Sequence, residues 1–518
     1  MPQKKSNANK SPKKKSSPVS SPAPHRSNGL LSFFIAIIAF TLGVLSPPSL
    51  HLFRHVTSQK TAISASSSKS IPAADVEEET HEPPSKWPLP PHTPCSSSNL
   101  ANYIHDTPVQ GLHIVCIEAL LGFDSDGKAI VPPSNNRQQQ HQLLENSNTL
   151  RFSFLNESVK PKLYQRKNIV GPMDRGVGSI HWNQIKHLLI NELELAPEGP
   201  RQQPWAIFTP LGERIVGLND QVSMTESEDE NSKVKSNAQI LEMLASSGMV
   251  LVFQGGQWRW PGVREGFQRH IELAPTLDFA KDHSSAEKRN ITVETLSLTP
   301  LVVSIKGFLT DRECDHISNT AGPRMNYSGV SLKDADKGKA ASNWRTSQSA
   351  FLSSGGDPIL TAIDHRTASL TRIPKVHQEV LQVLRYGEGE KYDAHHDYFD
   401  PKDYRSDKNT LGLIQHGKTN RFATVFWYLT TVKEGGETIF PRFRNKPLPR
   451  GYQHSDCRNG LKVKPQKGKV IIFYSLDSSG QMDPTSLHGA CPVTGEDDVK
   501  WAANKWIWIS PMGFTPED

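Results

Sequence analysis

The chain has 518 residues, and seven of its 59 basic residues lie within residues 1–28, which contain no acidic residue. The formal net charge of +6 comes from this leader, because the rest of the chain has 52 basic and 53 acidic residues and is close to neutral. Since no DNA- or RNA-binding motif accompanies the basic leader, the charge distribution argues against a nucleic-acid partner. Five cysteines exclude a disulfide-rich scaffold and offer no CxxC zinc motif.

The basic leader precedes an uncharged stretch, residues 29–45, that contains the apolar run LLSFFIAIIAF. Its seventeen residues are near the lower limit for a membrane-spanning helix, so a cleaved signal peptide stays the alternative. The long leader and the pair Pro47-Pro48, a poor cleavage site, favour a signal-anchor transmembrane helix over residues 29–47. Basic residues before the span place the N-terminus in the cytoplasm. We therefore expect a single-pass type II protein of the endoplasmic reticulum or Golgi membrane, with the chain after the span in the lumen.

Two regions follow the expected span. Residues 48–95 are rich in Ser, Pro, Thr and acidic residues, which predicts a flexible stalk. Residues 96–285 are expected to form a lumenal domain of mixed α/β structure, whose function the sequence does not reveal. Apolar patterns predict three strands in this domain, at residues 113–117, 206–209 and 249–253, and two helices, at residues 180–195 and 238–245.

The cysteines and glycosylation sequons depend on the compartment. Cys95 and Cys116 are close enough in sequence to be one candidate disulfide, which a lumenal location would permit. The pairing of the other three cysteines stays open, and an odd number leaves at least one thiol free or paired between chains. Three sequons, which predict a glycoprotein only if the lumenal topology holds, begin at Asn156, Asn290 and Asn326.

The C-terminal part of the chain has the pattern of an all-β domain. Apolar runs rich in β-branched and aromatic residues are separated by Gly/Pro turns, with no helix between them, at residues 421–429, 434–441, 468–474 and 500–510. Short strands in this arrangement predict a two-sheet jelly roll. The expected C-terminal domain, residues 296–513, is therefore mainly β, with flanking helices.

A His-x-Asp triplet lies in residues 392–397, YDAHHD, and His488 follows far downstream. On an extended strand, residues i and i+2 project to the same face, so His395 and Asp397 can bind one metal ion while His396 points away. Two histidines and one carboxylate form the facial triad of non-haem Fe(II) oxygenases, which leaves about three positions on the iron for a bidentate co-substrate and dioxygen. Such triplets are common by chance, so the neighbouring strands carry part of this prediction.

Several ordered segments resemble the catalytic domain of the prolyl 4-hydroxylase family of 2-oxoglutarate- and Fe(II)-dependent dioxygenases, whose fold is a double-stranded β-helix. The resemblance runs from about Pro300 to Pro511 and includes the patterns FLTDRECDHI at 308–317 and WRTS at 344–347. The other segments are YGEGEKYDAHHD at 386–397, NRFAT at 420–424, GGET at 435–438, LHGACPV at 487–493 and KWAANKW at 500–506.

The resemblance assigns residues to iron and to the co-substrate. It makes the same two histidines and aspartate the iron ligands, and Lys500 the partner of the distal carboxylate of 2-oxoglutarate, with Thr438 and Tyr386 hydrogen-bonding beside it. A compact ammonium on a long stem suits one carboxylate in a partly closed pocket. The spacing between His488 and Lys500 is two residues longer than the commonest family pattern, so Lys505 stays a fallback for this role.

Three further residues resemble the family's catalytic residues on the substrate side: Tyr392, Arg421 and Trp506. For Tyr392 and Trp506, packing in the core is an equally good interpretation, because buried aromatic side chains contribute large apolar areas in any fold. Arg421 lies at the start of the predicted strand at 421–429.

The resemblance implies a procollagen-proline 4-dioxygenase-like oxidoreductase that hydroxylates peptidyl proline in proline-rich secreted or membrane polypeptides. Succinate and carbon dioxide would be the co-products, and L-ascorbate the reductant that maintains activity. Two alternatives stay open: an enzyme with another acceptor, such as a lysyl residue or a small molecule, and a catalytically silent binding or scaffold protein. Loss of catalysis normally appears as a missing iron ligand or a missing lysine, and neither is missing here. The sequence is compatible with an oligomer as well as with a monomer.

Overall fold

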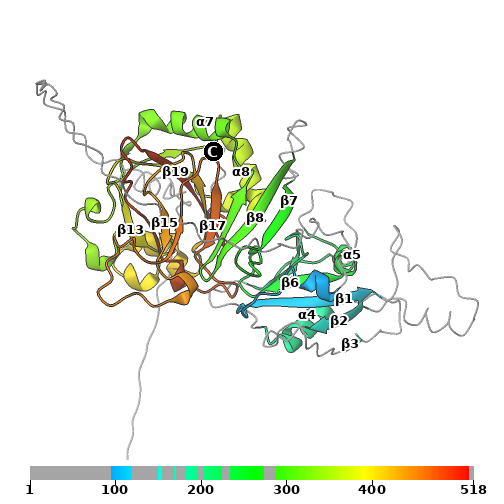
Figure 1. Cartoon of the computed structure of the whole chain (residues 1–518). Coiled ribbons are helices and arrows are strands. Elements are labelled where there is room, and N and C mark those ends of the chain that lie inside the picture. Colours follow the sequence, from blue (N-terminus) through cyan, green and yellow to red (C-terminus); the bar gives the residue numbers. More distant parts are fainter. Residues whose placement is uncertain are drawn as a thin grey trace, which may run out of the picture. The chain divides into compact units, whose positions relative to one another are not determined.

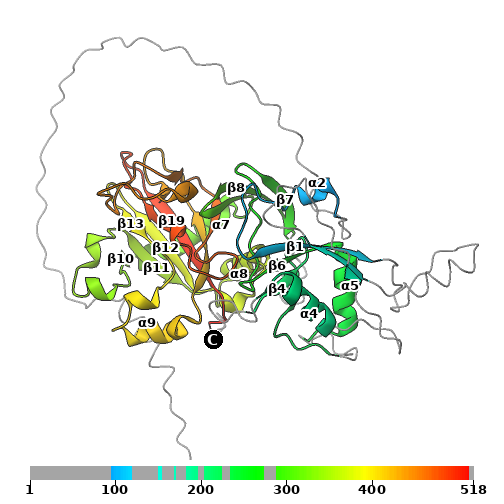
Figure 2. The same cartoon turned by 90° about the horizontal axis from the view of Figure 1, so that it is seen from below.

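The computed structural model describes residues 95–119, 150–154, 169–170, 182–195, 204–223, 234–273 and 288–512 (Figure 1, Figure 2). The predicted leader, the predicted span, the stalk up to residue 94 and the sequon at Asn156 lie outside these residues. Within them, no helix is both long enough and apolar enough to cross a membrane.

Residues before 285 contribute a six-stranded antiparallel sheet, in the order β3-β2-β1-β6-β4-β5 (Figure 2). Strand β6, Met249–Phe253, is buried at all five positions, because apolar side chains pack on both faces of the sheet. Strands β1, β4 and β6 confirm the three strands predicted in this region. The other bounds are β1 (Leu112–Ala119), β2 (Leu150–Phe154), β3 (Ile169–Val170), β4 (Ala206–Phe208) and β5 (Arg214–Gly217).

Two predicted helices are confirmed on one face of this sheet, and a short helix, α2, precedes β1. Ser236 caps α5, because its side chain accepts a hydrogen bond from Gln239 N while the Gln239 side chain accepts one from Ser236 N. Gly248, with φ at 64°, ends α5. The helices are α2 (Ser97–Leu100), α4 (Trp182–Glu192) and α5 (Asn237–Ser247), and their shared core includes Trp182, Ile185, Leu189, Ile240 and Leu244.

A nine-stranded antiparallel sheet has the order β10-β11-β12-β19-β14-β17-β9-β8-β7 (Figure 1). Strand β7 belongs to the predicted domain at 96–285, yet it pairs with β8 along its whole length, so one sheet extends across the predicted domain boundary. The strands are β7 (Gln268–Leu273), β8 (Arg289–Leu298), β9 (Leu301–Lys306), β10 (Asn326–Tyr327), β11 (Gln348–Leu352), β12 (Leu381–Tyr386), β14 (Arg421–Tyr428), β17 (Val470–Tyr474) and β19 (Lys500–Trp508).

A four-stranded sheet, in the order β13-β18-β15-β16, faces the larger sheet. Alternate residues of β14 point to opposite faces, as a strand requires. Phe426 and Tyr428 pack with Phe440 of the smaller sheet, whereas Val425 and Trp427 belong to the core on the other side. The region is therefore mainly β, as predicted. Its strands are β13 (Tyr392–His395), β15 (Thr438–Phe440), β16 (Leu461–Val463) and β18 (His488–Ala490).

Flanking helices cover the other face of the nine-stranded sheet, where Ile317 and Ile363 share a core with β14. Thr310 begins the first of them with a capping box to Glu313. These helices are α7 (Asp311–Ala321) and α8 (Pro358–Thr371), whereas α9 (Lys408–Leu413) packs in a separate core with Phe399 and Trp508. Short 3-10 turns lie at Gly322–Arg324, Asp334–Asp336, Ala341–Asn343, Lys375–His377, Pro401–Asp403, Gln415–Gly417, Phe443–Asn445 and Pro484–Ser486.

Candidate functional site

Three metal-binding side chains meet where β13 ends and β18 begins. Strand pairing sets His395 opposite His488, and Asp397 follows two residues after His395. One donor atom from each side chain lies within 4.8 Å of the other two. The carboxylate oxygens of Asp397 are 3.6 Å from His395 Nε2 and 3.5 Å from His488 Nε2. In the part of the chain that the structure describes, no other His, Cys, Asp or Glu residues form such a group.

His396 takes no part in this cluster. Its Nε2 atom donates a hydrogen bond of 3.1 Å to the carbonyl oxygen of Pro484, and its ring stacks on Tyr398 at 4.6 Å. Neighbouring side chains on an extended backbone point in opposite directions. The structure therefore agrees with the predicted register, in which His395 and Asp397 share one face and His396 leaves it.

Hydrogen bonds to backbone carbonyl oxygens fix the orientation of both histidines. His395 Nδ1 donates to the Asp393 carbonyl at 2.9 Å, and His488 Nδ1 donates to the Ser486 carbonyl at 3.0 Å. Because Nδ1 of each ring is used in this way, Nε2, the atom that faces Asp397, is the nitrogen left for a metal ion. The hydroxyl of Thr424 donates to Asp397 Oδ2 at 2.6 Å and fixes the carboxylate in turn. Such outer hydrogen bonds typically orient the ligands of a metal site.

The charge states in the cluster suit a divalent metal ion. Burial lowers the pKa of His488 to about 4, and the nearby Asp397 carboxylate offsets only part of that effect, so the imidazole is neutral at pH 7. Burial alone would raise the pKa of Asp397, but His488, His395 and Arg421 outweigh it and hold this pKa well below its usual range. Neutral imidazoles and an ionised carboxylate are the donors that non-haem Fe(II) takes. The residues present therefore fit that metal.

Lys500, the first residue of β19, carries a buried amine. Its side chain is 0% exposed, and Nζ has no hydrogen-bond partner among the described residues. The rings of Tyr386, Phe426 and Tyr428 surround Nζ, with centroids at 5.1, 5.6 and 5.8 Å. Burial lowers the pKa of Lys500 to about 7, and Glu437 offsets part of this effect. A buried ammonium is costly without an anion beside it, so this position favours an anionic ligand.

Tyr386 and Thr438, the other predicted co-substrate residues, lie on strands next to this amine. Tyr386 of β12 is the direct cross-strand partner of Lys500. Thr438 begins β15, pairs with Ala490 of β18, and accepts a hydrogen bond of 2.8 Å from the hydroxyl of Tyr428. These residues therefore place polar atoms between the two sheets, beside the strand that carries His488.

Lys505 lies on the opposite face of β19, because it is five positions after Lys500 and side chains of a strand alternate between its two faces. Its Nζ atom is 2.6 Å from Asp364 Oδ1 of α8, and the two side chains are only 2% and 4% exposed. The structure thus engages Lys505 in a buried ion pair away from the cluster. The longer spacing before Lys500 is absorbed between β18 and β19.

Tyr392 forms part of a stack that ends at the metal-binding cluster. Its ring lies 3.8 Å from the His395 ring at an angle of 23°, and the guanidinium of Arg345 lies over its other side at 4.6 Å. Burial raises the pKa of Tyr392 to about 12, so its hydroxyl stays protonated. Tyr392 therefore contacts a candidate ligand directly.

Arg421 and Trp506 contact each other beside the cluster. The guanidinium of Arg421 makes two hydrogen bonds to Glu379, at 2.6 and 2.9 Å, and lies 3.6 Å from the centroid of the Trp506 ring. Trp506 pairs across the strands with Thr424, which holds Asp397. Its indole Nε1 is buried and lacks a partner within the residues described.

Two disulfides are present, and one of them confirms the predicted pair Cys95–Cys116. The other joins Cys457 to Cys491, three residues after His488. Cys314 is the one free cysteine among the described residues, and it is buried in α7.

Three residues close to the cluster escaped the sequence analysis: Arg345, Thr424 and Tyr428. Thr424 and Tyr428 lie at i and i+4 on β14, so they share the face that the predicted strand turns toward the metal. That periodicity is the signal that could have found them. Arg345 belongs to the recognised WRTS segment, but its position over Tyr392 depends on distant chain folding.

Comparisons with known proteins agree with this geometry. Residues 381–508 match the model of the 2OG-Fe(II) oxygenase superfamily. Prolyl 4-hydroxylase 2 of Arabidopsis thaliana is 41% identical over 223 residues, which cover 42% of this chain and 70% of that protein. This chain belongs to the prolyl 4-hydroxylase family. Probable prolyl 4-hydroxylase 6 of Arabidopsis thaliana is 40% identical over 224 residues, covering 43% of this chain and 73% of that protein.

A solved structure also resembles this member of the family. It is the viral collagen prolyl hydroxylase of Paramecium Bursaria Chlorella virus-1 in complex with 2OG, with 26% identity and a TM-score of 0.29, and the match covers 40% of this chain and 96% of that one. The superfamily match contains all three cluster residues, Lys500, Tyr392, Arg421 and Trp506, whereas Arg345 and Glu379 precede it. Residues 95–273 lie before it.

Proposed function

We propose that this prolyl 4-hydroxylase family member hydroxylates peptidyl proline at carbon 4, with 2-oxoglutarate and dioxygen as co-substrates and succinate and carbon dioxide as co-products. One observation carries the proposal: a triad of two histidines and one carboxylate lies between the same two sheets as a buried lysine that has no partner among the described residues. A protein that had lost catalysis would have no reason to keep both features, because an unpaired buried amine is costly. The fold that this proposal implies is a double-stranded β-helix.

In this proposal, His395, Asp397 and His488 hold Fe(II), and Lys500 binds the distal carboxylate of 2-oxoglutarate with Tyr386 and Thr438 beside it. Fe(II), when bound, supplies the oxygen chemistry that 2-oxoglutarate drives. The chain's own contribution is to position the ligands. The backbone carbonyls that accept hydrogen bonds from the two Nδ1 atoms orient the imidazoles, and the Thr424 hydroxyl orients the carboxylate.

Tyr392, Arg421 and Trp506 would form the substrate side of the site. Arg421 is held by Glu379 and by the Trp506 ring, so little side-chain entropy is left to lose when a peptide binds. Flat aromatic rings suit contact with a proline ring. Ascorbate is part of the proposal as the reductant that maintains Fe(II).

The acceptor can be tested with a panel of peptides of equal length that contain proline, lysine or neither. With Fe(II), ascorbate and 2-oxoglutarate, oxygen should be added to proline in the proline peptides alone, and mass spectrometry of fragment ions locates the added oxygen. Oxygen on lysine, or turnover of 2-oxoglutarate that no peptide stimulates, would contradict a prolyl acceptor.

We also propose a type II membrane protein of the endoplasmic reticulum or Golgi with a lumenal catalytic region. The uncharged stretch after the basic leader supports this topology. Two disulfides are typical of an oxidising compartment. Two sequon asparagines, Asn290 in β8 and Asn326 in β10, are exposed.

The topology has a direct test. Protease added to intact microsomes should remove only the basic leader and leave the rest of the chain, and detergent should make the whole chain digestible. Asn326→Gln, Asn290→Gln and the double variant show which sequon carries glycan, because loss of a glycan increases gel mobility. Complete digestion without detergent would place the catalytic region in the cytosol.

A further inference from the structure

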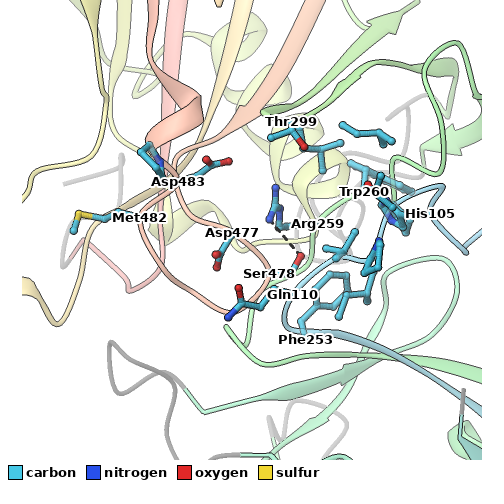
Figure 3. A pocket seen from close by; sticks show the side chains of 18 residues that line it. His105, Gln110, Phe253, Arg259, Trp260, Thr299, Asp477, Ser478, Met482 and Asp483 are labelled. Carbon is cyan, nitrogen blue, oxygen red and sulfur yellow. Dashed lines mark hydrogen bonds between the residues drawn. The ribbon is translucent and has the colours of Figure 1, made fainter. Parts of the chain in front are cut away.

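A second binding site is suggested by a cavity of about 200 Å³, whose lining includes none of the ligands of the proposed iron site (Figure 3). Four chain segments line it, and three of them precede the superfamily match at 381–508. The lining segments lie within residues 105–112, 253–261, 298–301 and 477–484.

Close backbone contacts hold the walls of this cavity together. Gly255 N donates a hydrogen bond of 2.9 Å to the Ser478 carbonyl. A Cβ atom at Gly255 would lie 2.6 Å from Gly480 N, and one at Gly111, where φ is +81°, would lie 2.5 Å from Ser479 N. No real side chain fits at such distances, so glycine lets the segments approach. The positions of the lining segments are therefore fixed by close packing of the backbone.

A buried guanidinium dominates the cavity. Arg259 is 6% exposed, and its Nη1 donates to the Ser478 hydroxyl at 3.3 Å (Figure 3). Its Nε has no partner in the described part of the chain, and the guanidinium lies 4.7 Å above the Tyr474 ring. Burial lowers the pKa of Arg259, whereas Tyr474, Asp477 and Asp483 act to raise it. Arginine stays charged in proteins, so unsatisfied cationic donors are available to a ligand with an anionic group.

Two aspartates in the cavity lining, Asp477 and Asp483, supply hydrogen-bond acceptors. Asp477 Oδ1 accepts bonds from Ser479 and Gln481, and Asp483 Oδ1 accepts bonds from Thr485. Among the described residues, the side-chain bonds of these two carboxylates therefore end on Oδ1, which leaves Oδ2 to accept from hydroxyl groups.

A third wall adds a neutral polar group and apolar surface. Burial, Arg269 and Arg259 lower the pKa of His105 to about 3, so its ring is uncharged. His105 Nε2 lacks a partner among the residues described. Phe253 and Trp260 line the same space (Figure 3).

We propose that this cavity binds a small monocarboxylic hydroxy acid of the sugar-acid type. Its carboxylate would pair with Arg259, and its hydroxyls would donate to Asp477 and Asp483. A second carboxylate would be repelled by the two aspartates, and an uncharged polyol would leave the guanidinium unpaired. The volume equals that of about seven water molecules at ~30 Å³ each, which suits a chain of three to about six carbons. This inference does not depend on the proposed hydroxylase activity.

Calorimetric titration of the full-length protein tests this site with three probes of one carbon length: gluconate, hexanoate and sorbitol. The titrations are repeated with Lys500→Ala, which removes the cation of the proposed 2-oxoglutarate site. Gluconate should bind in both proteins, and hexanoate and sorbitol at least about tenfold more weakly, as expected when one charged hydrogen bond is lost. Equal affinity for hexanoate or for sorbitol would overturn the proposed class, and loss of gluconate binding in Lys500→Ala would place it at the other site.

Variants locate the site. Arg259→Gln should weaken gluconate binding about tenfold or more, whereas Arg372→Gln, which removes another guanidinium near Trp260 outside the cavity lining, should leave it unchanged. If Arg259→Gln does not fold, Asp477→Asn serves instead, because asparagine keeps the Oδ1 acceptor. It should weaken gluconate and strengthen a dicarboxylate of equal length, glucarate. Unchanged gluconate affinity in the folded cavity variant would overturn the proposal.

Discussion

Each of the substitutions His395→Ala, Asp397→Ala and His488→Ala is expected to abolish succinate formation and stoichiometric Fe(II) binding. Only three side chains of the described chain meet at this position, so removing one leaves two protein donors. Iron content measured on the purified protein, together with succinate release, checks the prediction. Each variant should lose both iron binding and succinate release.

His396→Ala is the matched control for these variants. Its ring is next to the cluster in sequence, but it bonds Pro484 and stacks on Tyr398. We expect His396→Ala to bind iron and to keep most of its activity. An inactive His396→Ala protein beside an active His395→Ala protein would show that the assigned strand register is wrong.

Replacing Lys500 by alanine is expected to raise the 2-oxoglutarate concentration needed for half-maximal turnover by about 10- to 100-fold while iron binding persists. A hydrogen bond to a charged partner contributes about 1.5–3 kcal/mol, and each ~1.4 kcal/mol is a factor of ten. Because the pKa of Lys500 is lowered to about 7, its positive charge is lost as the pH rises through 7. The affinity of the wild-type protein for 2-oxoglutarate should therefore weaken from pH 7 to higher pH, and that dependence should vanish in Lys500→Ala. Kinetics at several pH values measure both effects.

Lys505→Ala separates the two lysines. It leaves Asp364 buried without its partner, which costs about 3–5 kcal/mol of unfolding free energy in typical cases. Denaturant unfolding should reveal this loss, whereas the 2-oxoglutarate requirement of the folded protein should stay the same. A raised requirement in Lys505→Ala, with Lys500→Ala unaffected, would contradict the assignment of Lys500.

Local patterns predicted much of the site. Strand periodicity placed His395 and Asp397 on one face, and the aromatic and β-branched runs predicted β14, β17 and β19 to within two residues. Family resemblance predicts Lys500 for the co-substrate carboxylate despite its longer spacing from His488, and the extra residues lie in the connection before β19 and leave that strand intact.

The remaining features depend on pairing between distant segments. The sequence alone could not separate Lys505 from Lys500 as the candidate for the co-substrate carboxylate, because the ion pair of Lys505 with Asp364 depends on the packing of α8 against β19. The pairing of β7 with β8 crosses a predicted boundary, since a strand's partner is set by tertiary packing and not by its own sequence. The cavity around Arg259 likewise brings together four segments whose individual sequences contain no binding motif.

The most direct test of the proposed hydroxylase activity is the ratio of 4-hydroxyproline to succinate formed from one proline peptide, with Asp397→Ala as the blank. Amino-acid analysis separates 4-hydroxyproline from its 3-hydroxy isomer, and succinate is measured in the same sample. We predict equal amounts of 4-hydroxyproline and succinate, both absent in the blank. Succinate without hydroxyproline, or oxygen at another residue or ring position, would contradict peptidyl proline 4-hydroxylation.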